Sequence, residues 1–237
     1  FLLGLLISDG AQGQAGGAIY LLKVKGTINP ALAGYIERGI DVAQDRGAGL
    51  IVIQLDTPGG LSDSMMDIVQ RIMGSRVPVV VYVSPAGGMA GSAGVFITMA
   101  SHVAAMAPGT MIGAAHPVSG GGAELSPTME EKVVNAFAAQ VRSIAEERGR
   151  NIEWAEQAVR KSVTLEASKA VDEKVVDLMA PDLNSLLNEI DGREVRMSGS
   201  STITLHTKDL PIVSLGMTWI ESFLFTISNP NVAYILM

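Results

Sequence analysis

Ser92 is the residue whose type and surroundings are best suited to a chemical reaction. It lies in the run Pro85–Gly94 (PAGGMAGSAG), after a predicted strand and at the start of a predicted helix. Small neighbours leave its hydroxyl accessible, and a helix N-terminus favours a developing negative charge, so Ser92 can act as a nucleophile in acyl transfer. The alternative is a helix-capping serine. The residues around it do not fit the G-x-S-x-G nucleophile motif, and the local pattern leaves both readings open.

A glycine-containing turn, Asp56–Gly60 (DTPGG), directly follows the apolar segment Leu50–Leu55. Paired glycines let the backbone turn sharply and present bare N–H groups to a ligand. Such amides can stabilise the oxyanion of an acyl-transfer reaction. An ordinary strand-to-helix turn would have the same composition.

A serine nucleophile needs a base, and the sequence offers two kinds. Of the three histidines, His102, His116 and His206, only His116 follows an apolar strand in a position that suits catalysis. A lysine can serve instead if its pKa is lowered. Lys132 lies near the start of a predicted helix, where the helix dipole disfavours a cation. Ala136 and Ala139 share its side of the helix, which predicts a close-packed surface around it, although most lysines are simply solvated.

The composition narrows the function classes further. The formal net charge of −7 argues against nucleic acid as a partner, because phosphates require a basic surface. The chain has no cysteine, which excludes a thiol nucleophile and a cysteine-based zinc site. Hydrophobic residues make up 48% and charged residues 17% of the 237 residues, so the chain can bury a large aliphatic core.

Strand and helix patterns alternate along the chain, which predicts an α/β protein. Continuous apolar runs indicate strands buried on both faces, and apolar residues at helical spacing indicate the helices that follow them. The predicted strands are 18–24, 50–55, 77–83, 103–107, 111–114 and 175–179, and the predicted helices lie near 30–46, 62–73, 93–100, 128–148, 152–160 and 166–171.

Both ends of the sequence are apolar. Phe1–Ile7 followed by Gly13-Gln14-Ala15 predicts that residues 1–17 are the remnant of a secretory signal. The apolar run Val232–Met237 is too short to span a bilayer, so residues 229–237 are predicted to begin a truncated membrane region. The intervening residues 18–228 would form one catalytic domain outside the cytoplasm, anchored to the cell membrane through segments beyond Met237.

Several separate motifs resemble the N-terminal domain of NfeD-family membrane serine proteases, also called stomatin operon partner proteins. They occur in the family's order and at its spacing, from about Ile19 to the end of the chain. The matching segments are Leu55–Gly60 (LDTPGG), Gly88–Gly94 (GMAGSAG), Ala107–Ala114 (APGTMIGA), Gly149-Arg150-Asn151, and Asn229–Tyr234 (NPNVAY).

The resemblance implies a Clp-protease/crotonase fold, a spiral of ββα units. It places Ser92 as the nucleophile, Lys132 as the general base, and the amides of Gly60 and Ala93 in the oxyanion hole, with no metal or cofactor. It also implies a dimer that cleaves hydrophobic peptide segments, in particular the C-terminal region of a stomatin-like membrane protein.

Alternatives to this Ser92–Lys132 dyad remain open. His116 follows Ser92 at nearly the base spacing of Clp proteases, but those enzymes also have an aspartate where this chain reads Arg160–Val163 (RKSV). A crotonase-like acyl-CoA enzyme would share the fold and the oxyanion hole, but the Glu130-Glu131 pair fits a first helical turn better than an acid/base pair. A catalytically inactive scaffold that binds a membrane partner is the third possibility.

Overall fold

The structure is a computed structural model that describes residues 17–118, 126–197, 199 and 201–228. Nearly all of the predicted signal remnant (1–17), the predicted membrane start (229–237) and the glycines 120–122 lie outside the described residues. In chain order the elements are β1 (Ile19–Lys25), α1 (Pro30–Asp45), β2 (Leu50–Asp56), α2 (Ser62–Met73), β3 (Val79–Val83), β4 (Met89–Gly91), α3 (Ala93–Ala100), β5 (Val103–Met106), β6 (Met111–Gly113), α4 (Pro127–Arg148), α5 (Ile152–Lys161), β7 (Thr164–Glu166), α6 (Ala167–Asp172), β8 (Leu178–Met179), α7 (Leu183–Ile190), β9 (Glu194–Arg196), β10 (Thr202–Thr204), β11 (Ile212–Leu215) and α8 (Trp219–Ile227).

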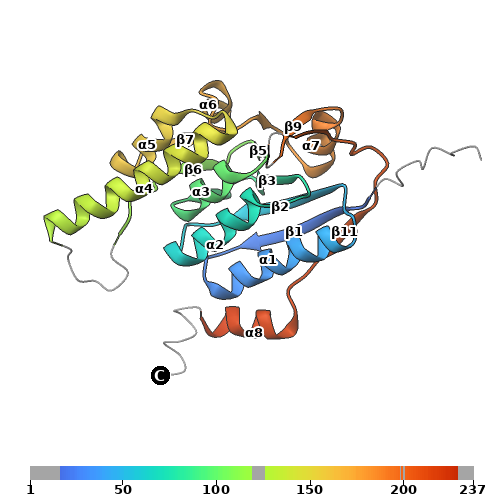
Figure 1. Cartoon of the computed structure of the whole chain (residues 1–237), viewed down its shortest axis with the longest axis horizontal. Coiled ribbons are helices and arrows are strands. Elements are labelled where there is room, and N and C mark those ends of the chain that lie inside the picture. The colour runs from blue at the N-terminus through green and yellow to red at the C-terminus, as the bar shows by residue number, and fades with distance from the viewer. Residues whose placement is uncertain (1–16, 119–125, 198, 200, 229–237) are drawn as a thin grey trace, which may run out of the picture.

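A six-stranded sheet in the order β11-β1-β2-β3-β5-β8 forms the centre of the molecule, and every neighbouring pair in it is parallel. The prediction of an α/β protein is confirmed. The continuous apolar runs of β2 and β3 match this position, because a central parallel strand is covered on both faces. Figure 1 shows α1 and α2 packed along one face of this sheet and α7 on the opposite side.

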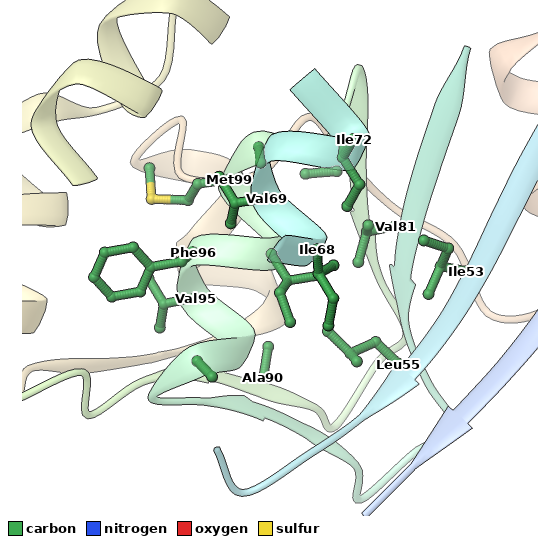
Figure 2. Packing of buried hydrophobic residues seen from close by; sticks show 14 of the residues in the cluster. Ile53, Leu55, Ile68, Val69, Ile72, Val81, Ala90, Val95, Phe96 and Met99 are labelled. Carbon is green, nitrogen blue, oxygen red and sulfur yellow. The ribbon is translucent and has the colours of Figure 1, made fainter. Parts of the chain in front are cut away.

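Two apolar cores cover the two faces of the sheet. Alternate residues of the central strands point toward α1, α2 and α3 and form the larger core, while the residues between them pack against α7 and β9. Figure 2 shows how Ile68 and Val69 of α2 and Val95 of α3 meet Ile53 and Val81 of the sheet. This packing fixes the helix that begins immediately after Ser92.

A second, three-stranded sheet (β4-β6-β7) carries the functional region. Its first strand, Met89–Gly91, lies inside the small-residue run Pro85–Gly94, for which the sequence predicted no strand. The strand predicted at 175–179 is reduced to Leu178–Met179. The amides of Val175 and Val176 donate instead to the carbonyl of Ala170, so these residues close the end of α6 before the chain joins the sheet.

The last two elements return to the first strand and helix. β11 pairs with β1 at the edge of the sheet, and α8 lies beside α1 (Figure 1). Among the described residues, no helix combines the length and apolar character that crossing a bilayer requires.

Candidate active site

Ser92 stands on a sharp turn between β4 and α3. Its backbone has φ 48° and ψ −109°, a region that a residue with a side chain enters at a cost of roughly 1–3 kcal/mol. The turn is held from both sides, because the Ser92 amide donates to Gly113 O (3.0 Å) and the Ser92 carbonyl accepts from Val95 N (3.0 Å). Its hydroxyl makes no capping bond to α3, so the helix-cap alternative is wrong. The turn has the shape of a nucleophile elbow although the sequence motif is absent.

Small residues around Ser92 are required by close packing. A Cβ atom on Gly91 would lie 2.8 Å from the carbonyl oxygen of Pro58, and one on Gly94 would lie 2.8 Å from the side chain of Thr57. The run of small residues therefore lets β4 and the start of α3 approach the turn that follows β2. Ala90, at the base of α3 in Figure 2, is fully buried in this contact.

The turn after β2 brings two glycines to Ser92. Gly59 has φ 130°, and a Cβ there would lie 2.6 Å from Ser92 Cβ and 3.2 Å from its Oγ. The fully buried Thr57 hydroxyl is 3.1 Å from both the amide and the carbonyl of Gly59 and so fixes this conformation. A Cβ on Gly60 would lie 2.1 Å from the carbonyl oxygen of Ile28, so only glycine fits there.

The predicted oxyanion-hole residues both line the cleft that contains Ser92. The two residues that flank Gly60 are both hydrogen-bonded to Ile28. Ile28 N donates to Gly59 O (2.8 Å), and Leu61 N donates to Ile28 O (2.9 Å). Within residues 17–118 and 126–228 as described, neither the Gly60 nor the Ala93 amide donates to a protein acceptor. Ala93 N is in the first turn of α3, where backbone amides have no partner within the helix. Both amides are therefore available to a bound oxygen atom.

The cleft has a volume of about 600 Å³ and mostly apolar walls. One wall is shared by α3 and α4, whose Phe96 and Phe137 rings pack edge to face with centroids 5.8 Å apart. Leu61, Met65 and Val118 contribute further apolar surface. Such a lining suits an extended apolar segment better than a charged ligand. Neither ring was predicted as part of the site, because apolar residues in α3 and α4 have the pattern of ordinary core positions.

His116 lines the same cleft, yet both of its ring nitrogens face groups other than Ser92. Nδ1 lies 2.9 Å from the carbonyl of Val159 and must donate to it, since a carbonyl only accepts. Nε2 lies 3.6 Å from a carboxylate oxygen of Glu130. The ring therefore links β6, α4 and α5. Glu130 was expected to match the helix dipole, and its contact with His116 depends on tertiary packing.

Lys132 lies one residue before Val133, which lines the cleft, but its own side chain is exposed. The expectation of a close-packed surface around it is not met, since Ala136 and Ala139 are exposed as well. Burial on α4 begins only at Ala138 and continues through Val141 and Ile144. The first turns of α4 project past the sheet (Figure 1), so they have fewer neighbours to cover them.

The fold and the site together define a class of protein. ClpP1 from Listeria monocytogenes matches with a TM-score of 0.56 at 22% identity, over 70% of this chain and 94% of that chain, and this establishes a Clp-protease-like fold. The profile of the family described as NfeD1b, N-terminal domain, matches residues 18–187. The chain belongs to this family, as the sequence motifs predicted.

The similar proteins include a membrane-bound protease and its solved structures. The membrane-bound protease PH1510 of Pyrococcus horikoshii is 37% identical over 224 residues, which make up 92% of this chain and 50% of that protein. This chain thus spans about half the length of that relative. A lysine-to-alanine variant of the 1510-N membrane-bound stomatin-specific protease, solved in complex with a substrate peptide, matches with a TM-score of 0.81 at 36% identity over 89% of this chain and 97% of that chain. A serine-to-alanine variant matches with a TM-score of 0.79 at 37% identity over 86% of this chain and 100% of that chain.

Proposed function

We propose that the domain is a serine endopeptidase that cleaves apolar peptide segments with Ser92 as its nucleophile. The observation that carries the proposal is the strained turn at Ser92, held against Gly59 at the floor of an apolar cleft. A conformation that costs free energy persists only where the surroundings enforce it, and such strain clusters at active sites.

The reaction follows from the groups that face the cleft. A base removes the proton of Ser92 as Oγ attacks the scissile carbonyl, and the carbonyl oxygen becomes an oxyanion that accepts hydrogen bonds from the Gly60 and Ala93 amides. Collapse of this intermediate breaks the C–N bond, the amine leaves with the proton held by the base, and Ser92 carries the acyl group. Water then attacks the ester, its proton passes to the base, and the carboxylic acid leaves as Ser92 is restored.

We assign the base role to Lys132 rather than to His116. His116 donates Nδ1–H to the Val159 carbonyl, and its Nε2 lies 3.6 Å from a carboxylate oxygen of Glu130, so both ring nitrogens are directed at groups other than Ser92. The Lys132 side chain is exposed, and Lys132 directly precedes Val133, which lines the cleft. Catalytic contacts often tighten only when substrate is bound, and a bound peptide would cover Lys132 from the solvent side. The solved lysine and serine variants of the relative fit the same pair of residue types.

The proposed substrate is the apolar C-terminal segment of a stomatin-like membrane protein. The relative is named stomatin-specific and membrane-bound, and the cleft of this chain has apolar walls that suit such a segment. The proposal includes anchoring in the cell membrane and a homodimer. It also places the catalytic domain on the extracytoplasmic side, and the apolar Phe1–Ile7 segment followed by small residues supports that side. Alkaline phosphatase fused after Thr207 of the full-length protein should then be active, and an inactive phosphatase fusion would contradict the proposed side of the membrane.

The nucleophile is tested with Ser92→Ala. Removing a nucleophile typically lowers the rate by several orders of magnitude, so we expect no detectable cleavage of an apolar peptide while the circular dichroism spectrum is unchanged. A fluorophosphonate should label the parent protein at Ser92 and the Ser92→Ala variant nowhere. Ser143→Ala, an exposed serine on the outer side of α4, is the control and should keep both activity and labelling. Cleavage above about a tenth of the parent rate, which is only ~1.4 kcal/mol of barrier, would reject Ser92.

The base is tested in the same assay. Lys132→Arg should be as inactive as Lys132→Ala, because a guanidinium cannot be deprotonated in a protein. His116→Ala should keep most of the activity. An inactive His116→Ala together with an active Lys132→Ala would replace the dyad with a Ser–His pair. Intact folding without labelling or cleavage in the parent protein would favour the inactive scaffold.

A further inference from the structure

α8 presents an apolar face to the outside of the molecule. Its residues Trp219, Ile220, Phe223, Leu224 and Ile227 are 80%, 50%, 60%, 44% and 40% exposed. Their spacing of one, three or four residues places them on one side of a helix. None of the nine residues of this helix is buried. The usual position of such side chains is inside a protein, so this surface requires an explanation.

The opposite side of α8 is fixed to the domain. Glu221, the one charged residue of the helix, accepts two hydrogen bonds from the Arg38 guanidinium on α1, at 2.7 and 2.8 Å. Arg38 also donates to the carbonyl of Gly216 (2.8 Å), just before the helix. Glu221 additionally forms a capping box with Thr218. The charge of the helix is therefore turned inward, and the helix cannot rotate its apolar face toward the domain without breaking these bonds.

α8 also lies close to the segment that shapes the cleft. The ring of Phe225 would be 3.0 Å from a Cβ on Gly26, so the two residues are in contact. Two residues later Ile28 makes the two backbone bonds that hold the Gly59–Leu61 turn beside Ser92. Figure 1 shows α8 lying along α1, on the side of α1 away from the sheet.

We infer that α8 lies flat in the interface of a lipid bilayer and holds the cleft beside the membrane, where an apolar segment leaving the bilayer can reach Ser92. The inference rests on the proposed peptidase function and deepens it. An uncharged face of large apolar residues with an exposed tryptophan is the surface that interfacial helices bury at the boundary between headgroups and acyl chains. The relative is named membrane-bound, and the sequence that follows α8 includes a second apolar run, Val232–Met237.

The kind of lipid that the protein binds distinguishes an apolar membrane contact from an electrostatic one. The outer face of α8 carries no Lys or Arg, and the chain has a net charge of −7. Binding should therefore be at least as strong to vesicles of neutral phosphatidylcholine as to vesicles containing anionic phosphatidylglycerol, and it should not weaken as salt is raised.

Trp219 provides a direct probe. The chain has two tryptophans, and Trp154 is buried in the domain, so a change of fluorescence on adding vesicles reports on Trp219. Phosphatidylcholine with bromine atoms near the headgroup should quench this fluorescence. The double variant Ile220→Ser/Phe223→Ser should bind vesicles at least tenfold more weakly, whereas Met179→Ser/Ile203→Ser, with 40% and 39% exposed positions elsewhere on the surface, should bind like the parent.

Cleavage separates the inference from the function on which it rests. The Ile220→Ser/Phe223→Ser variant should cleave a soluble apolar peptide within about twofold of the parent rate, but the same peptide tethered to vesicles at least tenfold more slowly. Failure of the parent to cleave the soluble peptide would reject the peptidase while leaving the vesicle result intact. Unchanged vesicle binding in this variant would overturn the interfacial placement. So would a variant that loses the dimer mass in light scattering while Trp219 of the parent shows no quenching, because α8 would then form a protein contact.

Discussion

At the scale of single residues, the contact between Gly59 and Ser92 determines where the hydroxyl can be. The Cβ introduced by Gly59→Ala would lie 2.6 Å from Ser92 Cβ, so either the turn or the serine must move. Displacing a reacting group by about 1 Å can cost about 100-fold in rate. We therefore expect Gly59→Ala to lower kcat/KM for an apolar peptide by about two orders of magnitude.

The control for this substitution is Gly192→Ala. Gly192 also has a positive φ (77°), but nothing lies within 4 Å of its Cβ position. Gly192→Ala should lower stability by about 1 kcal/mol, through the left-handed backbone alone, and leave kcat/KM unchanged. Equal activity of the two variants would show that Ser92 does not depend on the turn.

At the scale of elements, one buried arginine joins the α4–α5 hairpin to the rest of the domain. Arg150, between these two helices, donates to the carbonyls of Met99 (2.6 Å) and Ser101 (2.9 Å) at the end of α3 and to Asp177 (2.8 Å) before β8. Asp177 also accepts from Arg193 at 2.7 Å. Burial, the largest effect, lowers the pKa of Arg150, and the nearby Asp177 opposes that shift.

Removing this arginine should loosen the hairpin that carries one wall of the cleft. Breaking a buried ion pair from one side typically costs 3–5 kcal/mol, so we expect Arg150→Met to lower the unfolding free energy by about that amount in urea denaturation. Arg142→Met, at an exposed pair with Glu156, should change it little. A loss below about 1 kcal/mol for Arg150→Met would show that the network does not hold the hairpin.

At the scale of the whole molecule, one buried histidine makes folding sensitive to acid. Burial, together with the cations of Arg148 and Arg150, lowers the pKa of His102 from 6.5 to about 3. Between pH 6.5 and about 3, His102 is therefore protonated in the unfolded chain but neutral in the folded chain. The free energy of unfolding falls as the pH falls through this window. At 1.36 kcal/mol per pKa unit the total loss is on the order of 5 kcal/mol.

His102→Asn tests this dependence. Asparagine does not titrate and can keep an acceptor for the Val79 amide, which is 3.1 Å from Nδ1 of His102. Urea unfolding at pH 7, 5.5 and 4 should show a decline in stability that is shallower in the variant by roughly 3 kcal/mol at pH 4. The exposed His206→Asn should follow the parent curve. The same decline in His102→Asn and the parent would contradict the assigned origin.

The amino-acid sequence determined the α/β pattern, because apolar periodicity is set by which face of each element is buried. The apolar run of β2 reflects its burial on both faces, and the small-residue run before Ser92 reflects the close approach of neighbouring backbone. The family could be identified from the sequence because separate motifs keep their order along the chain. Missing the strand Met89–Gly91 and misplacing the one at 175–179 have a common cause, since both depend on partners distant in sequence.

Only the tertiary structure decided the conformation and surroundings of the site. The positive φ of Ser92 is enforced by a hydrogen bond to Gly113 and by contact with Gly59, 33 positions earlier in the chain. The exposure of Lys132 follows from how far α4 extends beyond the core. The outward face of α8 follows from the pairing of Glu221 with Arg38, 183 residues away. A local pattern specifies which residues can be buried, but the free energy of contacts between distant segments selects which of them are.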